Sequence, residues 1–212
     1  MAEGCHTGPV AQYTAISAAD WNEITISIGG RLRRARESMG LSEATVAERA
    51  GMIEPGYSRL ESGLPVELDG GQRGTPNPQL RRLHSVAAVL GVPVADLVDI
   101  PQLAPPGAYE PVRAMDTLRS DEHAGLFEHQ AGTDEWWAVY ASYFGIRVRA
   151  RRFQLGMTMA ALSDAIDVET PALAALETVD PRRPINPTVY TVALIAKALT
   201  VPLVDLLPVE IA

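Results

Sequence analysis

The sequence RLRRARESMGLSEATVAERAGMIEPGYSRLESG, from Arg31 to Gly63, has the pattern of three short helices joined by tight turns. A first helix is expected from Ile28 to Ser38, because apolar residues such as Leu32 recur on one face while four arginines occupy the others. Gly40 then ends this helix. The pattern therefore predicts helical structure on both sides of a short turn.

Signals for two more helices follow directly. Ser42 is a good N-cap for a second helix, and Gly51 supplies the left-handed residue that ends it. A third helix is expected from near Glu54, since Pro55 is tolerated in the first turn, where backbone amides have no partner. The residues of this helix that should face inward are Tyr57, Leu60 and Glu61. Two short helices joined in this way form a helix-turn-helix, whose second helix can lie in the major groove of DNA.

These residues resemble the Cro and phage-repressor-like (XRE-type) helix-turn-helix family. The matching motifs are Leu41-Ser42 after the first helix, Ala50-Gly51 between helices two and three, and Ser58–Gly63 at the end of helix three. The two further helices of the family correspond to Pro78–Leu90 and Pro93–Val98. The resemblance implies a five-helix domain that binds double-stranded DNA.

The same pattern occurs twice in the chain. A shift of 116 residues superposes Gly29 on Gly145, and after the third helix a shift of 109 superposes Asn77-Pro78 on Asn186-Pro187. The difference lies in a Gly-rich loop of the first copy, LPVELDGGQRGTPNP, residues 64–78. We therefore expect an all-α protein of two tandem lambda-repressor-like five-helix helix-turn-helix domains joined by an acidic, Pro-containing linker.

The expected domain boundaries follow from this repeat. Residues 1–20 form a flexible N-terminal segment, 21–98 the first helix-turn-helix domain, 99–136 the acidic linker, and 137–207 a second domain with a degenerate recognition helix. Prolines at the start of the linker favour an extended connector. A short helix is also possible at Met115–Phe127 within it.

A net charge of -8 would by itself argue against nucleic-acid binding, but the charge is distributed unevenly along the chain. Residues 21–98 carry a net charge of 0 and residues 137–207 carry +1, whereas residues 99–136 carry -6. The acidity therefore belongs to the linker. A near-neutral domain still binds DNA through a local basic surface, with weaker salt dependence than a strongly basic one.

Other functional classes are not favoured. The lone cysteine, Cys5, excludes an intrachain disulfide, and Cys5-His6 has no partners at metal-ligand spacing. His84 is alone on a helix, the carboxylates are scattered, and no Gly-rich phosphate loop follows a strand. No apolar run approaches about 18 residues. We therefore expect a cytoplasmic protein that is not an enzyme and has no metal or cofactor.

One pair of residues recurs in both copies at the same spacing, Arg36 with Glu61 and Arg152 with Glu177. The resemblance implies a structural ion pair between helices one and three. The remaining arginines of the two first helices are then expected at the surface, where phosphate contact and simple solvation are both open. These arginines are Arg31, Arg33, Arg34, Arg147, Arg149 and Arg151.

The resemblance places base-reading residues at the start of helix three and one turn later. In the first copy Arg59 could bond guanine O6 and N7, and Glu54 could accept from cytosine N4, although a surface salt bridge is the alternative for Arg59. In the second copy Ala175 replaces Arg59, so strong bidentate contacts are lost. The loop before helix four is expected along the phosphates, although Asn77 and Asn186 are equally suited to cap their own helix four.

The predicted DNA-binding residues belong to these two regions of each copy. They are Glu54, Pro55, Gly56, Ser58, Arg59, Arg73 and Asn77 in the first copy, and Thr170, Pro171, Ala172, Arg182, Arg183 and Asn186 in the second; Thr75 accompanies them.

The expected function is sequence-specific DNA binding by a repressor-like transcriptional regulator. The chain would act as an intrachain pseudo-dimer, with recognition helices roughly 34 Å apart. Alternatively, the first copy reads DNA and the second mainly forms a homodimer or carries an effector. The alternative is a protein-binding module, such as an antirepressor or antitoxin-like partner. Glu43 and Glu54 on the expected DNA face favour that alternative.

Overall fold

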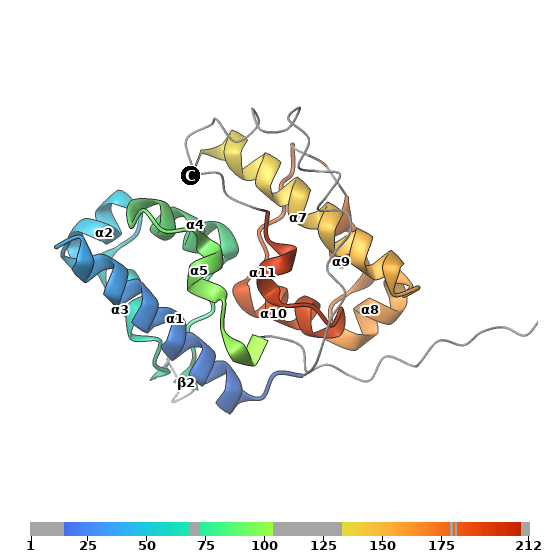
Figure 1. Ribbon diagram of the computed structural model, residues 1–212, viewed down its shortest axis with the longest axis horizontal. Helices are drawn as coiled ribbons and strands as arrows, with labels where there is room; N and C mark the ends of the chain where they lie inside the picture. Colours follow the sequence, from blue (N-terminus) through green and yellow to red (C-terminus); the bar gives the residue numbers. More distant parts are fainter. Residues whose placement is uncertain (1–14, 68–72, 104–132, 179, 181, 209–212) are drawn as a thin grey trace, which may run out of the picture.

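The chain folds mostly into α-helices in the computed structural model, which describes residues 15–67, 73–103, 133–178, 180 and 182–208 (Figure 1). The expectation of an all-α protein is confirmed at this level. Within these ranges the only strands are β1, Val66–Glu67, and β2, Arg73–Gly74, which pair antiparallel in the Gly-rich loop. None of the described helices combines the length and the apolar character needed to cross a membrane.

Helix α1 spans Ala18–Ser38, so the predicted start at Ile28 is wrong. Ser17 caps the helix by accepting a hydrogen bond from the backbone N–H of Asp20 at 3.1 Å. Trp21 is buried and extends the apolar face of α1 towards its N-terminus. The prediction missed these turns because it used only the apolar residues next to the arginine run.

The other helices of the first set are shorter, and most begin and end close to the predicted residues. They are α2 (Glu43–Arg49), α3 (Glu54–Ser62), α4 (Leu80–Val89) and α5 (Val94–Val98), followed by a 3₁₀ helix, η1 (Pro101–Leu103). Ser42 caps α2 as predicted, accepting from the Thr45 N–H at 3.1 Å. Gly63 ends α3 with φ +65°.

A second set of helices has matching bounds. It comprises α7 (Asp134–Gln154), α8 (Met159–Ile166), α9 (Thr170–Glu177), α10 (Val189–Ala198) and α11 (Leu203–Leu206). The 116-residue shift carries both ends of α1 onto those of α7, and the 109-residue shift carries α4 onto α10. The periodicity of the sequence is therefore expressed helix by helix.

Each long helix crosses a short one at a glycine. A Cβ atom on Gly29 would overlap the carbonyl oxygen of Glu61, where α1 meets α3. A Cβ atom on Gly145 would overlap the carbonyl oxygen of Leu176 in the same way, where α7 meets α9. Only glycine allows the two backbones to approach this closely, so these crossings fix how α3 and α9 lie on their supports.

The two helix sets meet at the N-termini of α4 and α10, which we call the seam. The backbone N–H of Leu80 donates to Pro187 O at 2.8 Å, and that of Val189 donates to Pro78 O at 2.9 Å. Gln79 and Thr188 face each other between these bonds as an isolated antiparallel bridge. Because each bond has its equivalent under the 109-residue shift, the seam is reciprocal.

Two asparagines complete the seam by capping the opposite helix. Asn186 Oδ1 accepts from the Arg81 N–H of α4 at 3.1 Å, and Asn77 Oδ1 accepts from the Tyr190 N–H of α10 at 3.2 Å. The interpretation of Asn77 and Asn186 as caps of their own helices is therefore wrong. Gln79 is the N-cap residue of α4, but its side chain caps no amide of that helix. The second helix set therefore supplies acceptors for the first amides of α4.

The buried apolar side chains of both sets form one continuous core. Trp21 of α1 packs edge-on against Tyr190 of α10, with ring centroids 4.9 Å apart. His84 of α4 is buried against Tyr140 and Trp136 of α7, at centroid distances of 4.1 and 5.0 Å. His84 is thus part of the packing between the sets. The molecule is held together by this shared core as well as by its chain connection.

Parts of the predicted linker belong to the core. Ile100, Leu103 and Trp136 lie within residues 99–136 but are buried. The proposed helix at Met115–Phe127 lies outside the described residues, as does Cys5-His6.

Figure 1 shows α5 and α11 side by side in the middle of the molecule, with α2 and α8 at opposite ends. Helices α2 and α8 therefore lie far from each other.

Candidate nucleic-acid interface

Helix α3 presents one polar face to solvent and buries the other. Tyr57, Leu60 and Glu61 are buried as predicted. Glu54, Pro55, Ser58 and Arg59 are exposed, whereas Gly56 is half-buried. Because the helix starts from an extended Ile53 and carries Pro55 in its first turn, its exposed N-terminal end is free of side-chain caps. The predicted base-reading residues of the first copy therefore share one accessible face.

A buried ion pair anchors α3 to α1. Arg36 donates from Nε to Glu61 Oε2 and from its NH2 group to Oε1, both at 2.7 Å, and its NH1 group donates to Leu41 O at 2.9 Å. Arg33 Nε adds a third bond to Glu61 at 3.2 Å. Burial disfavours the Glu61 carboxylate, but the hydrogen bonds from Arg36 and Arg33 outweigh it and lower the pKa of Glu61.

The same anchor occurs in the second set. Arg152 donates to both carboxylate oxygens of Glu177, at 2.7 and 2.6 Å, and its NH1 group donates to Met157 O at 2.9 Å. The bond to Glu177 raises the pKa of Arg152 despite its burial. Both predicted ion pairs are present, and each also ties the end of the long helix to the turn that follows. Their role is to hold α3 and α9, not to contact a ligand.

Two arginines predicted at the surface are buried. Arg147 is 5% exposed and donates to Leu207 O, and Arg151 is 4% exposed and donates from Nε to Leu199 O at 3.1 Å. These carbonyls end α11 and α10, where a cation is favourable and the backbone oxygens need donors. The prediction failed because spacing along α7 does not reveal which helix ends lie against it. Arg31 similarly donates to Asp96 O.

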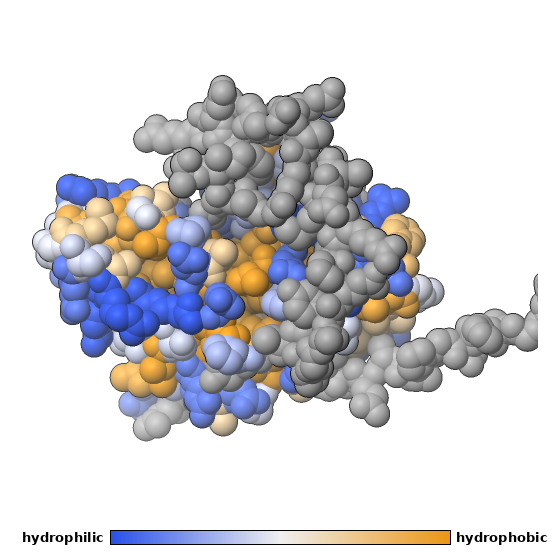
Figure 2. Space-filling model, viewed as in Figure 1, coloured by the Kyte–Doolittle hydropathy of each residue, from blue (hydrophilic) through white to orange (hydrophobic). Residues whose placement is uncertain are grey.

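The remaining arginines of α1 stay at the surface. Arg33 and Arg34 are exposed on α1, and Arg149 is exposed on α7. Figure 2 shows a band of hydrophilic residues along α1, between two areas of hydrophobic surface. Because Glu37 and the Glu61-bound Arg33 belong to the same helix, this band is not purely cationic. It therefore gives less attraction for phosphate than the arginine run alone predicts.

A shallow groove separates α3 from the start of α4. It has a volume of about 190 Å³, and Gly56, Arg59, Asn77, Pro78 and Arg82 line it. Arg82 was missed in the sequence analysis, which examined the loop before helix four but not the exposed face of that helix. Helical spacing from the buried Leu83 and Val86 would have placed Arg82 at the surface.

The other predicted phosphate contacts of the first copy are less well placed. Arg73 lies in β2, away from the start of α4 in sequence. The Thr75 hydroxyl donates to Asn22 Oδ1, so this side chain is turned to α1. Asn77 of this loop lies at the groove beside α3.

Helix α9 occupies the position of α3 but offers a different face. Thr170, Pro171, Ala172 and Ala175 are exposed, and the Thr170 hydroxyl is hydrogen-bonded to Ser163 Oγ at 3.0 Å. The exposed face of α9 is thus mostly methyl groups and a proline ring. It has no cation and little hydrogen-bonding capacity for base edges.

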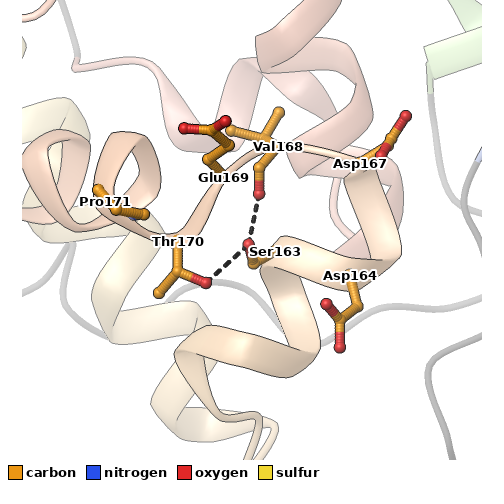
Figure 3. Close-up of a pocket in the computed structure, with 7 residues that line it drawn as sticks. All are labelled: Ser163, Asp164, Asp167, Val168, Glu169, Thr170 and Pro171. Carbon is orange, nitrogen blue, oxygen red and sulfur yellow. Dashed lines mark hydrogen bonds between the residues drawn. The ribbon is translucent and has the colours of Figure 1, made fainter.

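The turn before α9 is acidic. A hollow of about 420 Å³ lies beside this turn, and Asp164, Asp167 and Glu169 line it (Figure 3). Figure 3 shows these three carboxylates pointing in different directions from the hollow. No group of His, Cys, Asp or Glu side chains in the described part of the chain could hold a metal ion. Carboxylates here repel phosphate, and they do not converge on a cation.

The loop before α10 differs from its counterpart. Arg182 and Arg183 are exposed in a turn that Asp180 stabilises by accepting the Arg182 N–H at 3.0 Å. Asn186 has no freedom to contact phosphate, because its Oδ1 accepts from Arg81 and its Nδ2 donates to Gln79 Oε1 at 3.0 Å. Of the three predicted phosphate contacts in the second copy, the two arginines remain available.

No protein-family model matches this chain, and neither a curated protein nor a solved structure matches it. The geometry of the surfaces around α3 and α9 is therefore the basis for a function. Those surfaces differ in the charge and the hydrogen-bonding capacity of their exposed residues, while their buried supports are alike.

Proposed function

We propose that the chain is a sequence-specific, DNA-binding transcriptional regulator of the repressor type. In this proposal residues 21–98 and 137–207 are tandem five-helix domains of the Cro and phage-repressor-like (XRE-type) class. The matching helix bounds, the glycine crossings and the two buried ion pairs support a duplicated domain. A regulator of this kind works in the cytoplasm.

The observation that carries the proposal is the exposed face of α3. Arg59 is exposed there and forms no ion pair with any described residue, so its guanidinium is available to a ligand. The Arg36–Glu61 pair holds the helix behind it. In the major groove Arg59 bonds guanine O6 and N7, and Glu54 accepts from cytosine N4. A rigid helix with these two groups reads a G·C-containing site.

Ile53 adds an apolar element to the same face. It is the N-cap residue of α3 and is 75% exposed, more than any other large apolar side chain in the described part of the chain. Beside Glu54 it would meet the thymine C5-methyl group in the major groove. The proposed half-site therefore combines a G·C pair with a neighbouring thymine.

The second helix set serves as a built-in partner of the first. Its seam with α4 is reciprocal, as in a two-fold dimer, but α9 carries no cation on its exposed face. We propose that one chain docks on DNA as a pseudo-dimer in which α3 alone reads bases. Arg182 and Arg183 then add weak contacts to phosphate.

A second candidate is supported by the acidic turn. Asp164, Asp167 and Glu169 are exposed together before α9, and Glu54 is exposed at the start of α3. Surfaces of this kind suit a protein partner better than a phosphate backbone. The second candidate is thus a protein-binding module of the antirepressor or antitoxin-like kind, which keeps the helix arrangement without reading DNA.

A binding titration separates the two candidates. Duplexes selected from a genomic library and random duplexes are titrated with the chain at two salt concentrations, and fluorescence anisotropy is measured. We expect tighter binding to the selected duplexes and weaker binding at higher salt. Arg59→Ala should reduce the preference for the selected duplex about tenfold or more, and Arg182→Ala should weaken all duplexes similarly. Arg149→Ala, which removes an exposed arginine of α7, is the charge-matched control.

The absence of saturable, salt-sensitive binding would exclude the DNA-binding proposal. Equal losses from Arg59→Ala and Arg149→Ala would show that α3 does not read bases.

A further inference from the structure

The groove between α3 and α4 gathers three hydrogen-bond donors from different segments. Arg59 comes from α3, Arg82 from α4 and Asn77 from the loop between them. Pro76 and Pro78 flank Asn77 in the same groove and have no backbone N–H. The two prolines therefore offer no backbone donor to an anion in this part of the groove.

Both guanidinium groups are available. Arg59 and Arg82 are exposed, and neither forms an ion pair with the residues that the structure describes. Arg81, the neighbour of Arg82, is instead paired with Asp134 across the seam. Two planar guanidinium forks on the two walls of a groove favour an anion with several oxygens.

The second helix set orients the third donor. Asn77 Oδ1 accepts from the Tyr190 N–H of α10 at 3.2 Å, which fixes the plane of the side-chain amide. The Nδ2 donor is at the other end of that amide, and it has no partner among the described residues. The seam thus leaves Asn77 with its acceptor used and its donor free for a ligand in the groove.

The seam also occupies two backbone amides at the nearby N-terminus of α4. The N-terminus of a helix normally offers free amides to a phosphate. In α4 the Leu80 N–H is bonded to Pro187 O and the Arg81 N–H to Asn186 Oδ1. An anion beside α3 is therefore held by side chains in the groove rather than by the end of α4.

We propose that Arg59, Asn77 and Arg82 form a seat for one phosphate group beside the base-reading face of α3. The inference deepens the proposed function and rests on it, because the phosphodiester of a bound duplex is the source that lies next to that face. A free phosphate is the other source of the same chemistry. Arg59 then has two roles, since its guanidinium lies between the base edges and the backbone.

The second helix set has no such seat. The positions equivalent to Arg59 and Arg82 are Ala175 and Thr191, and the equivalent of Asn77 is Asn186, whose amide is fully bonded. The seat is thus a property of one half of the molecule. It predicts that one strand of a single half-site carries the strongest phosphate contact.

The test uses the full chain and a random-sequence duplex, with anisotropy measured over a series of salt concentrations. Arg82→Ala should weaken binding about tenfold and reduce the slope of log affinity against log salt by about 1. Arg149→Ala, with the same change in net charge, should leave that slope unchanged. Asn77→Asp keeps the oxygen that caps α10 but places a carboxylate in the groove, so it should weaken binding further. Asn186→Asp is its matched control across the seam.

A second arm identifies the source of the phosphate. Inorganic phosphate is titrated into the wild-type chain, into Arg82→Ala and into Arg149→Ala, and amide resonances of α4 are followed by NMR. A phosphate response that Arg82→Ala abolishes, together with unchanged duplex binding, would support a seat for a free phosphate. Identical behaviour of Arg82→Ala and Arg149→Ala in both arms would overturn the seat. If the wild type binds no duplex, the proposed function fails, whereas the inorganic phosphate arm still decides whether the seat exists.

Discussion

Helices α3 and α9 have the same supports but opposite surfaces. Both lie on a glycine of the preceding long helix and are held by a bidentate arginine–glutamate pair. On the exposed side, Ile53 and Arg59 of the first set correspond to Glu169 and Ala175 of the second. The residues that support the two helices are therefore buried and repeated, and the residues on their exposed faces are divergent.

The largest expected effect concerns the two buried ion pairs. Glu177→Ala leaves Arg152 buried without its partner and should lower the free energy of unfolding by about 3–5 kcal/mol. Glu61→Ala should cost less, because the side chain of Arg36 is 13% exposed against 6% for Arg152. Urea denaturation of the full chain measures both. Glu23→Ala, at an exposed position of α1, should change the free energy of unfolding by less than about 0.5 kcal/mol. A larger loss of stability from Glu61→Ala than from Glu177→Ala would contradict the expectation that the more deeply buried pair contributes more.

The next effect tests whether the exposed residues alone separate the two surfaces. A triple variant, Asp167→Gly, Glu169→Ile and Ala175→Arg, gives the second set the residues of the first at these positions. We expect it to bind random duplexes about tenfold more tightly, since one guanidinium is gained and two carboxylates are lost near the backbone. The double variant without Ala175→Arg controls for the removal of charge. No gain in either variant would mean that α9 cannot approach DNA at all.

The two asparagines of the seam should contribute similarly to the free energy of unfolding, whereas the exposed faces of α3 and α9 differ. Asn77→Ala removes one side-chain bond to the N-terminus of α10, where Thr188 still caps the helix, and Asn186→Ala removes the side-chain cap of α4. Each should lower the free energy of unfolding by about 1 kcal/mol. Thermal unfolding of the full chain compares the two variants. Asn186→Ala should cost slightly more, because the bond of Asn186 Nδ2 to Gln79 is lost as well. An effect confined to one variant would show that the reciprocal bonds are not equivalent.

The smallest effect concerns the apolar contact of α3 with DNA. Ile53→Ala should weaken binding to a selected thymine-containing duplex about threefold to fivefold, in line with roughly 0.8 kcal/mol for each buried methylene. Replacing that thymine by uracil should have the same effect on the wild type and little further effect on the variant. Glu169→Ala, which keeps Ile53, should respond to the base change as the wild type does. Additive losses from Ile53→Ala and uracil would rule out a direct contact.

Most helix positions were predictable because they depend on local spacing. The stops at Gly40 and Gly63 and the cap at Ser42 follow from residues near one another along the chain. The pairing of Arg36 with Glu61 was expected from its recurrence in the repeat and from the family resemblance. The start of α1 was missed because its first turns bury Trp21 against Tyr190, a residue of the other helix set. Local patterns do not report such contacts.

The roles of individual polar residues were less predictable. Arg147 and Arg149 lie on the same helix with the same local composition, yet the first is buried at the end of α11 and the second is exposed. Asn77 and Asn186 were recognised as caps, but each caps the helix opposite to the expected one. Arg82 was not singled out, because only the approach of α3 to α4 brings it beside Arg59.

The sequence by itself determined that the protein is helical, that its pattern is written twice and that the second helix-turn-helix lacks the cation of the first. Periodicity and residue chemistry are enough for these conclusions, because they act within one helix or one turn. Only the tertiary structure decided that the two helix sets share a core and cap each other at the seam, which leaves Asn77 directed to the groove with Arg59 and Arg82. Backbone amides and carbonyls carry no residue identity, so the pairing of one helix end with another emerges only when the chain is folded.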